Sequence, residues 1–221
     1  MSRRDAERAL LCEGGAGLGL AFGEEVAERL LLYRDLLQRW NRVYNLTAVR
    51  DPAQMVSLHL LDSLAVAPWL HGTRLIDVGS GPGLPGIPLA IAEPARSFVL
   101  LDSNGKKCRF MQQAIIELGL DNLAVVHSRV EAYRPDAPFD CVLTRAFAGI
   151  GRTLQLAGHL CAPDGALLLL KGDVVDADLE EAAGAGYLAQ RVPLQVPGVE
   201  GRRALLTLRA QARIDGGERD G

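Results

Sequence analysis

The segment from Leu75 to Gly86, with the sequence LIDVGSGPGLPG, constrains the fold of this chain more than any other. A short apolar strand carrying Asp77 near its end leads directly into a loop rich in glycine. Glycines in such a loop let the backbone approach a ligand, because a Cβ would collide with it or forbid positive φ angles. A turn of this kind between a buried strand and a helix is typical of α/β folds that bind a nucleotide-like cofactor.

The acidic residues around this loop predict which cofactor it holds. Asp77 stands two residues before the first glycine, where its carboxylate would repel a phosphate but attract an ammonium or a sulfonium. A second apolar strand ends at Asp102, where a carboxylate can accept hydrogen bonds from both hydroxyls of a ribose. S-adenosylmethionine has an adenosine ribose and a cationic methionyl arm, so we predict it as the cofactor. The alternatives are a tight turn with no ligand and a nicotinamide-dependent oxidoreductase.

Composition and charge narrow the class of protein. A chain of 221 residues can bury a full core in one domain with a modest appendage. Its formal charge of -3 means that a nucleic-acid partner would have to meet a local basic patch. We expect a cytoplasmic protein, because the sequence has no apolar run of membrane-spanning length and no signal-peptide core. A monomer is expected, since nothing in the sequence demands a larger assembly. The four cysteines are widely spaced, so neither a metal site nor a disulfide framework is predicted.

Four parts are predicted along the chain. They are a flexible N-terminal segment, a helical N-terminal cap, a methyltransferase-like α/β domain and a disordered tail, over residues 1–21, 22–72, 73–210 and 211–221 respectively. Apolar residues at helical spacing predict one cap helix over 24–44. A second cap helix is expected to begin at Pro52, with Asp51 as its cap, and to run through Leu70.

Strands and helices alternate after the cap, which indicates a doubly wound α/β sheet. The predicted strands cover 74–78, 97–101, 123–127, 139–143, 166–170, 188–195 and 203–209, and the predicted helices cover 85–92, 104–118, 150–161 and 174–184. The first five strands are short apolar runs, as in a parallel sheet covered on both faces. The last two flank a Pro-Gly reversal and predict an antiparallel edge. The predicted fold class is therefore α/β: a seven-stranded, mostly parallel Rossmann-like sheet with an antiparallel C-terminal strand, as in class I S-adenosylmethionine-dependent methyltransferases.

Ligands of such sheets bind beyond the carboxyl ends of the strands. The residues expected to contact the cofactor there are Gly79, Gly81 and Leu84 in the loop, Asp102 at the ribose, and Val130 and Glu131 near the adenine. Asp102 has the alternative role of capping the next helix, although a neighbour could do so instead. Glu131 has the alternative of a solvated side chain in a first helical turn.

The segment Thr144-Arg145-Ala146-Phe147 follows the fourth strand, where the acceptor should face the methyl group. It lacks the Asn/Asp-Pro-Pro-aromatic pattern of enzymes that methylate exocyclic amines, and no cysteine is well placed to attack a pyrimidine C5. Arg145 remains, suited to a phosphate, the cofactor carboxylate or an acceptor edge of a base, with a surface salt bridge as its alternative. Guanine N7 has a free lone pair, so it can attack the methyl carbon once the two atoms are aligned, without removal of a proton. No catalytic residue is therefore predicted for such an acceptor, and Arg145 is a candidate for positioning the reactants. His59 is expected to pack or to form hydrogen bonds within a helix.

Several short motifs occur in one order along the chain. They are WNxxYNLT from Trp40, HxLDS from His59, DVGSGPGLPGIPL from Asp77, LDS from Leu101, SRVE from Ser128, TRAF from Thr144 and LKG from Leu170. Together they resemble the family of bacterial small-subunit ribosomal RNA guanine-N7 methyltransferases G, also called glucose-inhibited division protein B, over roughly residues 25 to 210. The chain departs from relatives at Thr144, where they often have Ser.

The resemblance implies a function and a set of contacts. It implies methyl transfer from S-adenosylmethionine to N7 of guanine 527 in the 16S rRNA of the small ribosomal subunit. It implies cofactor contacts at Gly79, Leu84, Val130, Glu131 and Arg145, with Asp102 at the ribose. By family analogy it also makes Arg129, Lys171 and Arg203 candidates for contact with RNA or with the cofactor. Whether naked RNA, an assembly intermediate or a finished subunit is the substrate stays open, as does a non-catalytic RNA-binding role for the same fold.

Overall fold

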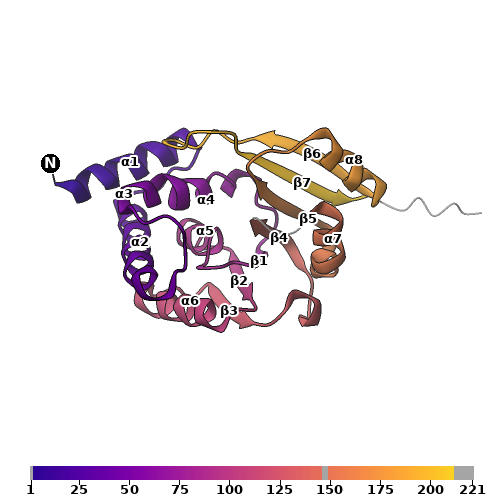
Figure 1. The fold of residues 1–221 in the computed structure, drawn as a ribbon, viewed down its shortest axis with the longest axis horizontal. Coiled ribbons are helices and arrows are strands. Elements are labelled where there is room, and N and C mark those ends of the chain that lie inside the picture. The colour runs from indigo at the N-terminus through magenta and orange to yellow at the C-terminus, as the bar shows by residue number, and fades with distance from the viewer. Residues whose placement is uncertain (1, 146–148, 212–221) are drawn as a thin grey trace, which may run out of the picture.

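The computed structural model describes residues 2–145 and 149–211, and its centre is a seven-stranded sheet (Figure 1). The strands are β1 Arg74–Val78, β2 Ser97–Asp102, β3 Leu123–His127, β4 Phe139–Arg145, β5 Cys161–Lys171, β6 Tyr187–Pro193 and β7 Ala204–Ala210. Their order across the sheet is β3-β2-β1-β4-β5-β7-β6. The first five strands pair in parallel, and β7 runs antiparallel to both β5 and β6. The predicted fold class is confirmed.

Alternate residues of the strands enter two different cores, because side chains of a strand point to opposite faces of the sheet. On β5, Leu168 and Leu170 pack with the N-terminal cap, whereas Leu167 and Leu169 pack on the other face. Both sets are nearly fully buried. The continuous apolar runs of the sequence therefore arise from a sheet that is covered on both sides.

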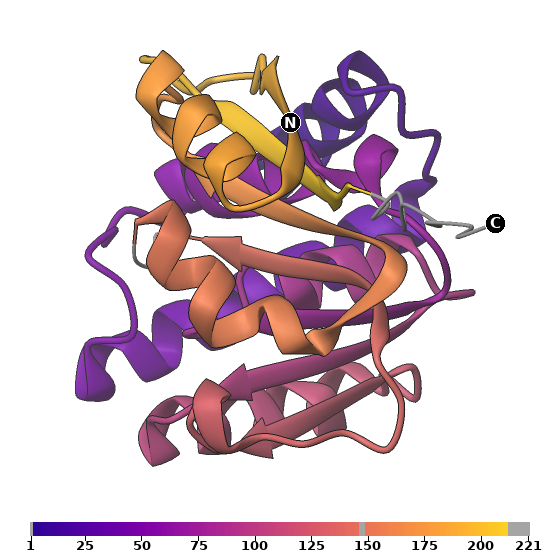
Figure 2. The same cartoon turned by 90° about the vertical axis from the view of Figure 1, so that its right-hand side faces the viewer.

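Helices cover the two faces of the sheet (Figures 1 and 2). The helices after the cap are α5 Gly86–Ala92, α6 Gly105–Leu118, α7 Ile150–Ala157 and α8 Asp176–Gly184, with short 3₁₀ turns η3 Val130–Ala132 and η4 Gly158–Leu160. Helices α5 and α6 contribute to the core that the cap shares, and α7 and α8 contribute to the opposite one. Helix α7 ends at Ala157, four residues before its predicted limit at residue 161, since Gly158–Leu160 tighten into η4.

The N-terminal cap contains the helix α2 Glu24–Tyr44, with the predicted bounds. The second predicted cap helix, over 52–70, is not continuous. It consists of α3 Pro52–Met55, the π-helical turn η1 Val56–Leu61, α4 Asp62–Leu64 and the 3₁₀ turn η2 Ala67–Trp69. Asp51 caps its start by accepting a hydrogen bond from the Ala53 N–H. Pro68 lacks an N–H and cannot extend an α-helical ladder, which accounts for the 3₁₀ turn at the end.

The N-terminal segment differs from its prediction, because residues 3–17 form the helix α1 Arg3–Gly17 and not a flexible lead-in. Ser2 and Asp5 form a capping box at its start, and Leu11 is fully buried. A Cβ at Gly14 would lie 2.7 Å from the side chain of Leu61, and one at Gly15 would lie 2.5 Å from the ring of Phe22. The glycines that suggested a loop are thus small residues at a packed interface, a role that composition alone does not reveal.

The remaining expectations concern the tail and the membrane. The predicted disordered tail lies outside the described residues apart from Gln211, whose N–H donates to the carbonyl of Gly186. Among residues 2–145 and 149–211, no helix is long and apolar enough to cross a membrane.

Candidate cofactor and acceptor site

The glycine loop, residues 79–86, uses all of its backbone donors inside the protein. Its six non-proline N–H groups belong to Gly79, Ser80, Gly81, Gly83, Leu84 and Gly86, and they donate to the carbonyls of Leu101 and Ser80 and to the carboxylates of Asp102 and Asp77. A phosphate-binding loop needs such N–H groups free. This loop can instead offer carbonyl oxygens, which accept hydrogen bonds from an ammonium group and suit a cationic ligand.

The glycines of the loop serve two purposes. Gly79, Gly81 and Gly83 have φ angles of 69°, 60° and 92°, which other L-residues rarely adopt. A side chain at Gly83 would collide with Ile87 on α5, so this glycine is also required for packing. At Gly81, by contrast, a Cβ would meet nothing closer than the Lys107 ammonium at 3.9 Å. The loop is therefore open at Gly81, where a ligand can approach its backbone.

Asp102 is held in place at the end of β2. One of its carboxylate oxygens accepts from the Gly81 N–H at 2.8 Å, and the other accepts from the Asn104 N–H at 2.8 Å. The helix α6 is capped by Asn104, whose side chain accepts from two backbone N–H groups. Asp102 is therefore not needed as the cap, and each of its oxygens keeps a lone pair for a ribose hydroxyl. Its role at the ribose stays a prediction.

Asp77 is fully buried at the end of β1 and lacks a complete set of partners. Its Oδ2 accepts a hydrogen bond of 2.9 Å from the Gly86 N–H, while its Oδ1 has no partner among the described residues. Burial raises the pKa of Asp77 to about 7, against the smaller opposing effects of the Gly86 N–H and Arg145. A buried carboxylate oxygen without a partner is costly, so a cationic ligand would be favoured beside it. The residues of the loop thus fit a cofactor with a positively charged arm.

The segment after β3 is more open to solvent. Val130 begins η3 and is buried, whereas Glu131 is half exposed and its carboxylate lies 4.0 Å from the guanidinium of Arg129. Arg129 is itself 78% exposed. Both charged side chains are accessible from outside, as an adenine contact for Glu131 and an RNA contact for Arg129 require.

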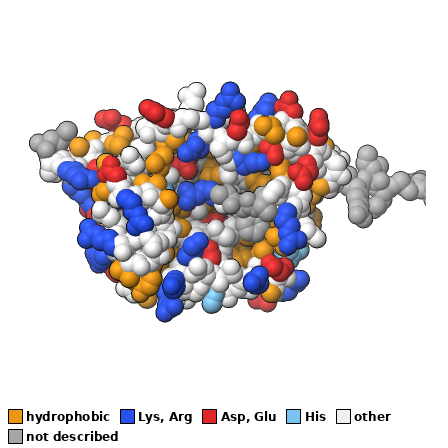
Figure 3. All heavy atoms as spheres, in the orientation of Figure 1, with side chains coloured by type: hydrophobic (Ala, Val, Ile, Leu, Met, Phe, Trp, Pro, Cys, Tyr) orange, Lys and Arg blue, Asp and Glu red, His pale blue; other side chains and the backbone are white. Residues whose placement is uncertain are grey.

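A cavity of about 600 Å³ opens over the carboxyl ends of β4 and β5 and the start of β7, and β4 is the strand next to β1, from which the glycine loop begins. It is lined by Val49, Leu58, His59, Asp62, Thr144, Arg145, Ile150, Thr153, Leu169, Leu170, Lys171, Gly172, Leu194, Arg203 and Ala204, which we call the acceptor pocket. In the space-filling view, Lys and Arg side chains border the middle of this face, where apolar side chains show in a hollow (Figure 3). A pocket with an apolar lining and a few polar groups is the usual form of a small-molecule or base-binding site.

Three of the predicted contact residues meet in the acceptor pocket. Arg145, Lys171 and Arg203 all line it, although the sequence separates them by up to 58 residues, from 145 to 203. Lys171 pairs with Asp178 on α8 at 2.6 Å. Arg129 is not among the lining residues. Ala146 and Phe147, which were expected to face the acceptor, lie outside the described residues.

Asp62, at the start of α4, connects the cap to this pocket. Its carboxylate lies 3.1 Å from Nε of Arg203 and 3.7 Å from a terminal nitrogen of Arg145. The ion pair of Arg145 is therefore partly buried within the pocket and is not a surface salt bridge. The sequence patterns do not mark Asp62 as a site residue, although the HxLDS motif contains it.

His59 forms hydrogen bonds, as expected. Its Nε2 lies 2.8 Å from the hydroxyl of Thr47, and its Nδ1 lies 3.0 Å from the carbonyl of Leu58. Burial lowers the pKa of His59 to about 4, so the ring is neutral near pH 7. It holds the loop that follows α2 against the pocket.

The sequence of this chain was compared with those of known protein families. The family model described as rRNA small subunit methyltransferase G matches residues 26–206. The chain belongs to the rRNA small subunit methyltransferase G family. Relatives named ribosomal RNA small subunit methyltransferase G include one from Methylococcus capsulatus, 50% identical over 90% of this chain and 97% of the relative. Another, from Ectopseudomonas mendocina, is 49% identical over 95% of this chain and 98% of the relative. The family predicted from the motifs is confirmed.

Solved structures similar to this member of the methyltransferase G family include other methyltransferases. Magnesium protoporphyrin IX methyltransferase from Synechocystis PCC 6803, solved with bound S-adenosylmethionine, has a TM-score of 0.58 and 18% identity over 82% of this chain and 97% of that one. The glycopeptide N-methyltransferase MtfA, complexed with S-adenosylhomocysteine, has a TM-score of 0.58 and 11% identity over 69% of this chain and 87% of that one. At such identities the likeness establishes the fold.

Proposed function

We propose that this protein transfers the methyl group of S-adenosylmethionine to N7 of a guanine in 16S rRNA of the small ribosomal subunit. The observation that carries the proposal is the position of two features at one edge of the sheet. A loop suited to a cationic cofactor follows β1, which carries the buried Asp77. The neighbouring strand β4 ends at Arg145, in a pocket that Lys171 and Arg203 also line. Membership of the methyltransferase G family supports the same substrate class.

The cofactor would occupy the half of the edge formed by β1, β2 and β3. Asp77 and the loop carbonyls would meet its cationic methionyl end, and Asp102 would accept from the ribose hydroxyls. Val130 and Glu131 would border the adenine. Bound there, the cofactor supplies an electrophilic methyl carbon, and the residues of the chain hold it facing the acceptor pocket.

The acceptor chemistry suits guanine N7. Among the described lining residues, His59 is neutral and engaged in hydrogen bonds. Asp62, the carboxylate of the pocket, is paired with Arg145 and Arg203. Neither side chain is therefore a free general base. Covalent catalysis at a pyrimidine C5 would need a thiolate, but burial raises the pKa of Cys141 to about 12. Guanine N7 needs neither, because its lone pair can attack the methyl carbon directly once the two are aligned. Arg145 would position the base or the cofactor without taking part in proton transfer.

Mapping the methylated nucleotide tests the proposal. Purified protein is incubated with S-adenosylmethionine and small subunits from a strain lacking the gene, and the RNA is analysed by mass spectrometry. We expect N7-methylguanosine at guanine 527, and no product from Arg145→Ala. Wild-type protein that methylates another atom, or nothing, contradicts the proposal. Naked RNA and assembly intermediates, compared in the same assay, identify the form of substrate.

Calorimetry separates this proposal from a nicotinamide-dependent enzyme of the same fold. The protein is titrated with S-adenosylmethionine and with NAD. We expect binding of S-adenosylmethionine only, since the loop has no free N–H groups for a pyrophosphate. Binding of NAD alone would overturn our interpretation of Asp77.

A further inference from the structure

We propose that Asp62 recognises the target base, by accepting hydrogen bonds from the N1–H and the 2-amino group of the guanine in the acceptor pocket. This inference rests on the proposed function and adds the residue that distinguishes guanine from other purines. It is carried by the position of Asp62 in the pocket, by the charges around it and by an unpartnered hydroxyl nearby.

Guanine presents two adjacent donors, N1–H and the 2-amino group, on the edge opposite N7. If N7 faces the methyl group, that edge points away from the cofactor. A carboxylate is the side chain that accepts from two adjacent donors at once. Among the described lining residues, Asp62 is the only carboxylate in the acceptor pocket.

The placement of Asp62 in the fold agrees with this orientation. The cofactor loop follows β1 and Asp102 ends β2, so the cofactor half lies toward β3 in the strand order. The acceptor pocket lies over β4, β5 and β7 on the other side of β1, and Asp62 reaches it from the cap. Asp62 thus faces the acceptor half of the site.

Two arginines orient Asp62 and partly offset the burial that raises the pKa of its carboxyl group. Arg203 and Arg145 approach different oxygens of its carboxylate, at 3.1 and 3.7 Å. Each oxygen has a second lone pair, so both can still accept from a base. The side chain is only 10% exposed, which keeps water from competing strongly for those hydrogen bonds.

A second polar group in the pocket lacks a partner. The hydroxyl of Thr144 is buried, lines the pocket and has no hydrogen-bond partner among the described residues. Buried hydroxyls are normally paired, so its state indicates a missing ligand. Guanine carries acceptors at O6 and N3 that a hydroxyl can satisfy. The pocket therefore combines a double acceptor with a donor, as the polar edge of guanine requires.

Inosine provides the test, because it is guanosine without the 2-amino group. Small subunits are reconstituted with 16S RNA that carries either guanosine or inosine at the target position. Rates of methyl transfer at subsaturating subunit are compared for the wild type and for Asp62→Asn. We expect the wild type to prefer guanosine by about ten-fold or more, and Asp62→Asn to lose most of this preference while its binding of S-adenosylmethionine is unchanged.

The outcomes separate recognition from a structural role and from failure of the proposed function. Asp176→Asn, which removes a carboxylate that is 82% exposed outside the pocket, should keep the preference of the wild type. If Asp62→Asn is slow on both RNAs but keeps the preference, Asp62 only positions the arginines and the inference is wrong. Equal rates of the wild type on both RNAs also overturn it, without need of a folded variant. No methylation of guanosine subunits by the wild type would instead contradict the proposed function.

Discussion

The hydroxyl of Tyr33, on α2, donates a hydrogen bond of 2.8 Å to the carbonyl of Pro82, in the middle of the glycine loop. Both groups are buried. Tyr33 also contacts Phe110 of α6, with ring centroids 6.3 Å apart, and Trp40 packs edge-on against the same ring. The N-terminal cap thus supports the glycine loop and contributes to the candidate cofactor site together with the sheet.

Tyr33→Phe should weaken cofactor binding and lower stability. The substitution leaves the buried carbonyl of Pro82 without its donor, which costs about 1–3 kcal/mol of folding free energy. We expect the Kd for S-adenosylmethionine in calorimetry to rise several-fold, with a lower midpoint of urea unfolding. Tyr44→Phe, at the half-exposed end of the same helix, should change neither quantity. An unaltered Kd in Tyr33→Phe would show that the hydrogen bond does not shape the loop.

Asp102→Asn should reduce cofactor affinity more strongly. The carboxylate accepts from two backbone N–H groups on different oxygens, and an amide would bring its own N–H₂ against one of those donors. We expect at least about a ten-fold rise in Kd for S-adenosylmethionine. Asp121→Asn, at an exposed position before β3, is the matched control. Affinity within two-fold of the wild type in Asp102→Asn would contradict a ribose contact.

The raised pKa of Asp77 predicts a pH dependence of stability. Because the folded protein holds the proton of Asp77 up to a pKa of about 7, whereas the unfolded chain releases it near its ordinary value, this residue favours folding most at low pH. Its contribution should decline as pH rises from about 4 to about 7 and then stay constant. Urea unfolding of the wild type and Asp77→Asn across pH 4 to 8 isolates the effect.

We expect the free energy of unfolding of the wild type, relative to Asp77→Asn, to fall by on the order of a few kcal/mol over that range. A difference that stays flat, or rises with pH, would contradict the raised pKa. The affinity for S-adenosylmethionine should instead rise as pH increases over the same range, since the ionised carboxylate of Asp77 binds a cationic arm more tightly.

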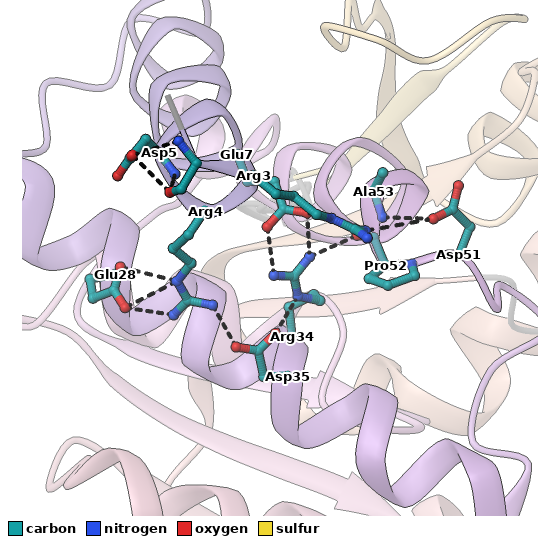
Figure 4. A network of polar contacts seen from close by, with 11 residues as sticks. Arg3, Arg4, Asp5, Glu7, Glu28, Arg34, Asp35, Asp51, Pro52 and Ala53 are labelled. Carbon is teal, nitrogen blue, oxygen red and sulfur yellow. Dashed lines mark hydrogen bonds and ion pairs between the residues drawn. The ribbon is translucent and has the colours of Figure 1, made fainter.

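Breaking the ion pair between α1 and α2 should destabilise the whole protein. The carboxylate of Glu7 lies 2.9 Å from the guanidinium of Arg34, and both side chains are nearly buried (Figure 4). Among the residues that the structure describes, Glu7→Ala leaves the buried cation with Asp35 and the carbonyl of Pro52 as its hydrogen-bond partners. We expect a loss of about 3 kcal/mol in urea unfolding. Arg3→Ala removes a side chain that is 64% exposed, and should cost less than about 1 kcal/mol.

Local patterns predicted most of the fold. The seven strands and the helix α2 followed from short apolar runs and helical spacing, because each pattern reports burial of one local segment. The cap beyond Asp51 was predicted less well, since π-helical and 3₁₀ turns depend on packing around the segment. The helix α1 was missed because Gly14 and Gly15 resemble a loop in sequence but face neighbouring side chains at close range.

For the candidate site, too, local sequence patterns predicted one part and the tertiary structure decided the other. The glycine loop, Asp77 and Asp102 are adjacent to strand ends, so the sequence alone determined their place at the carboxyl edge of the sheet. Their contacts with a cofactor stay a prediction. Only the tertiary structure decided which basic residues share a pocket and that Asp62 lies between two of them. Arg145 and Arg203 meet Asp62 across distant parts of the chain. Such contacts depend on how the cap docks on the sheet, which no local pattern of residues encodes.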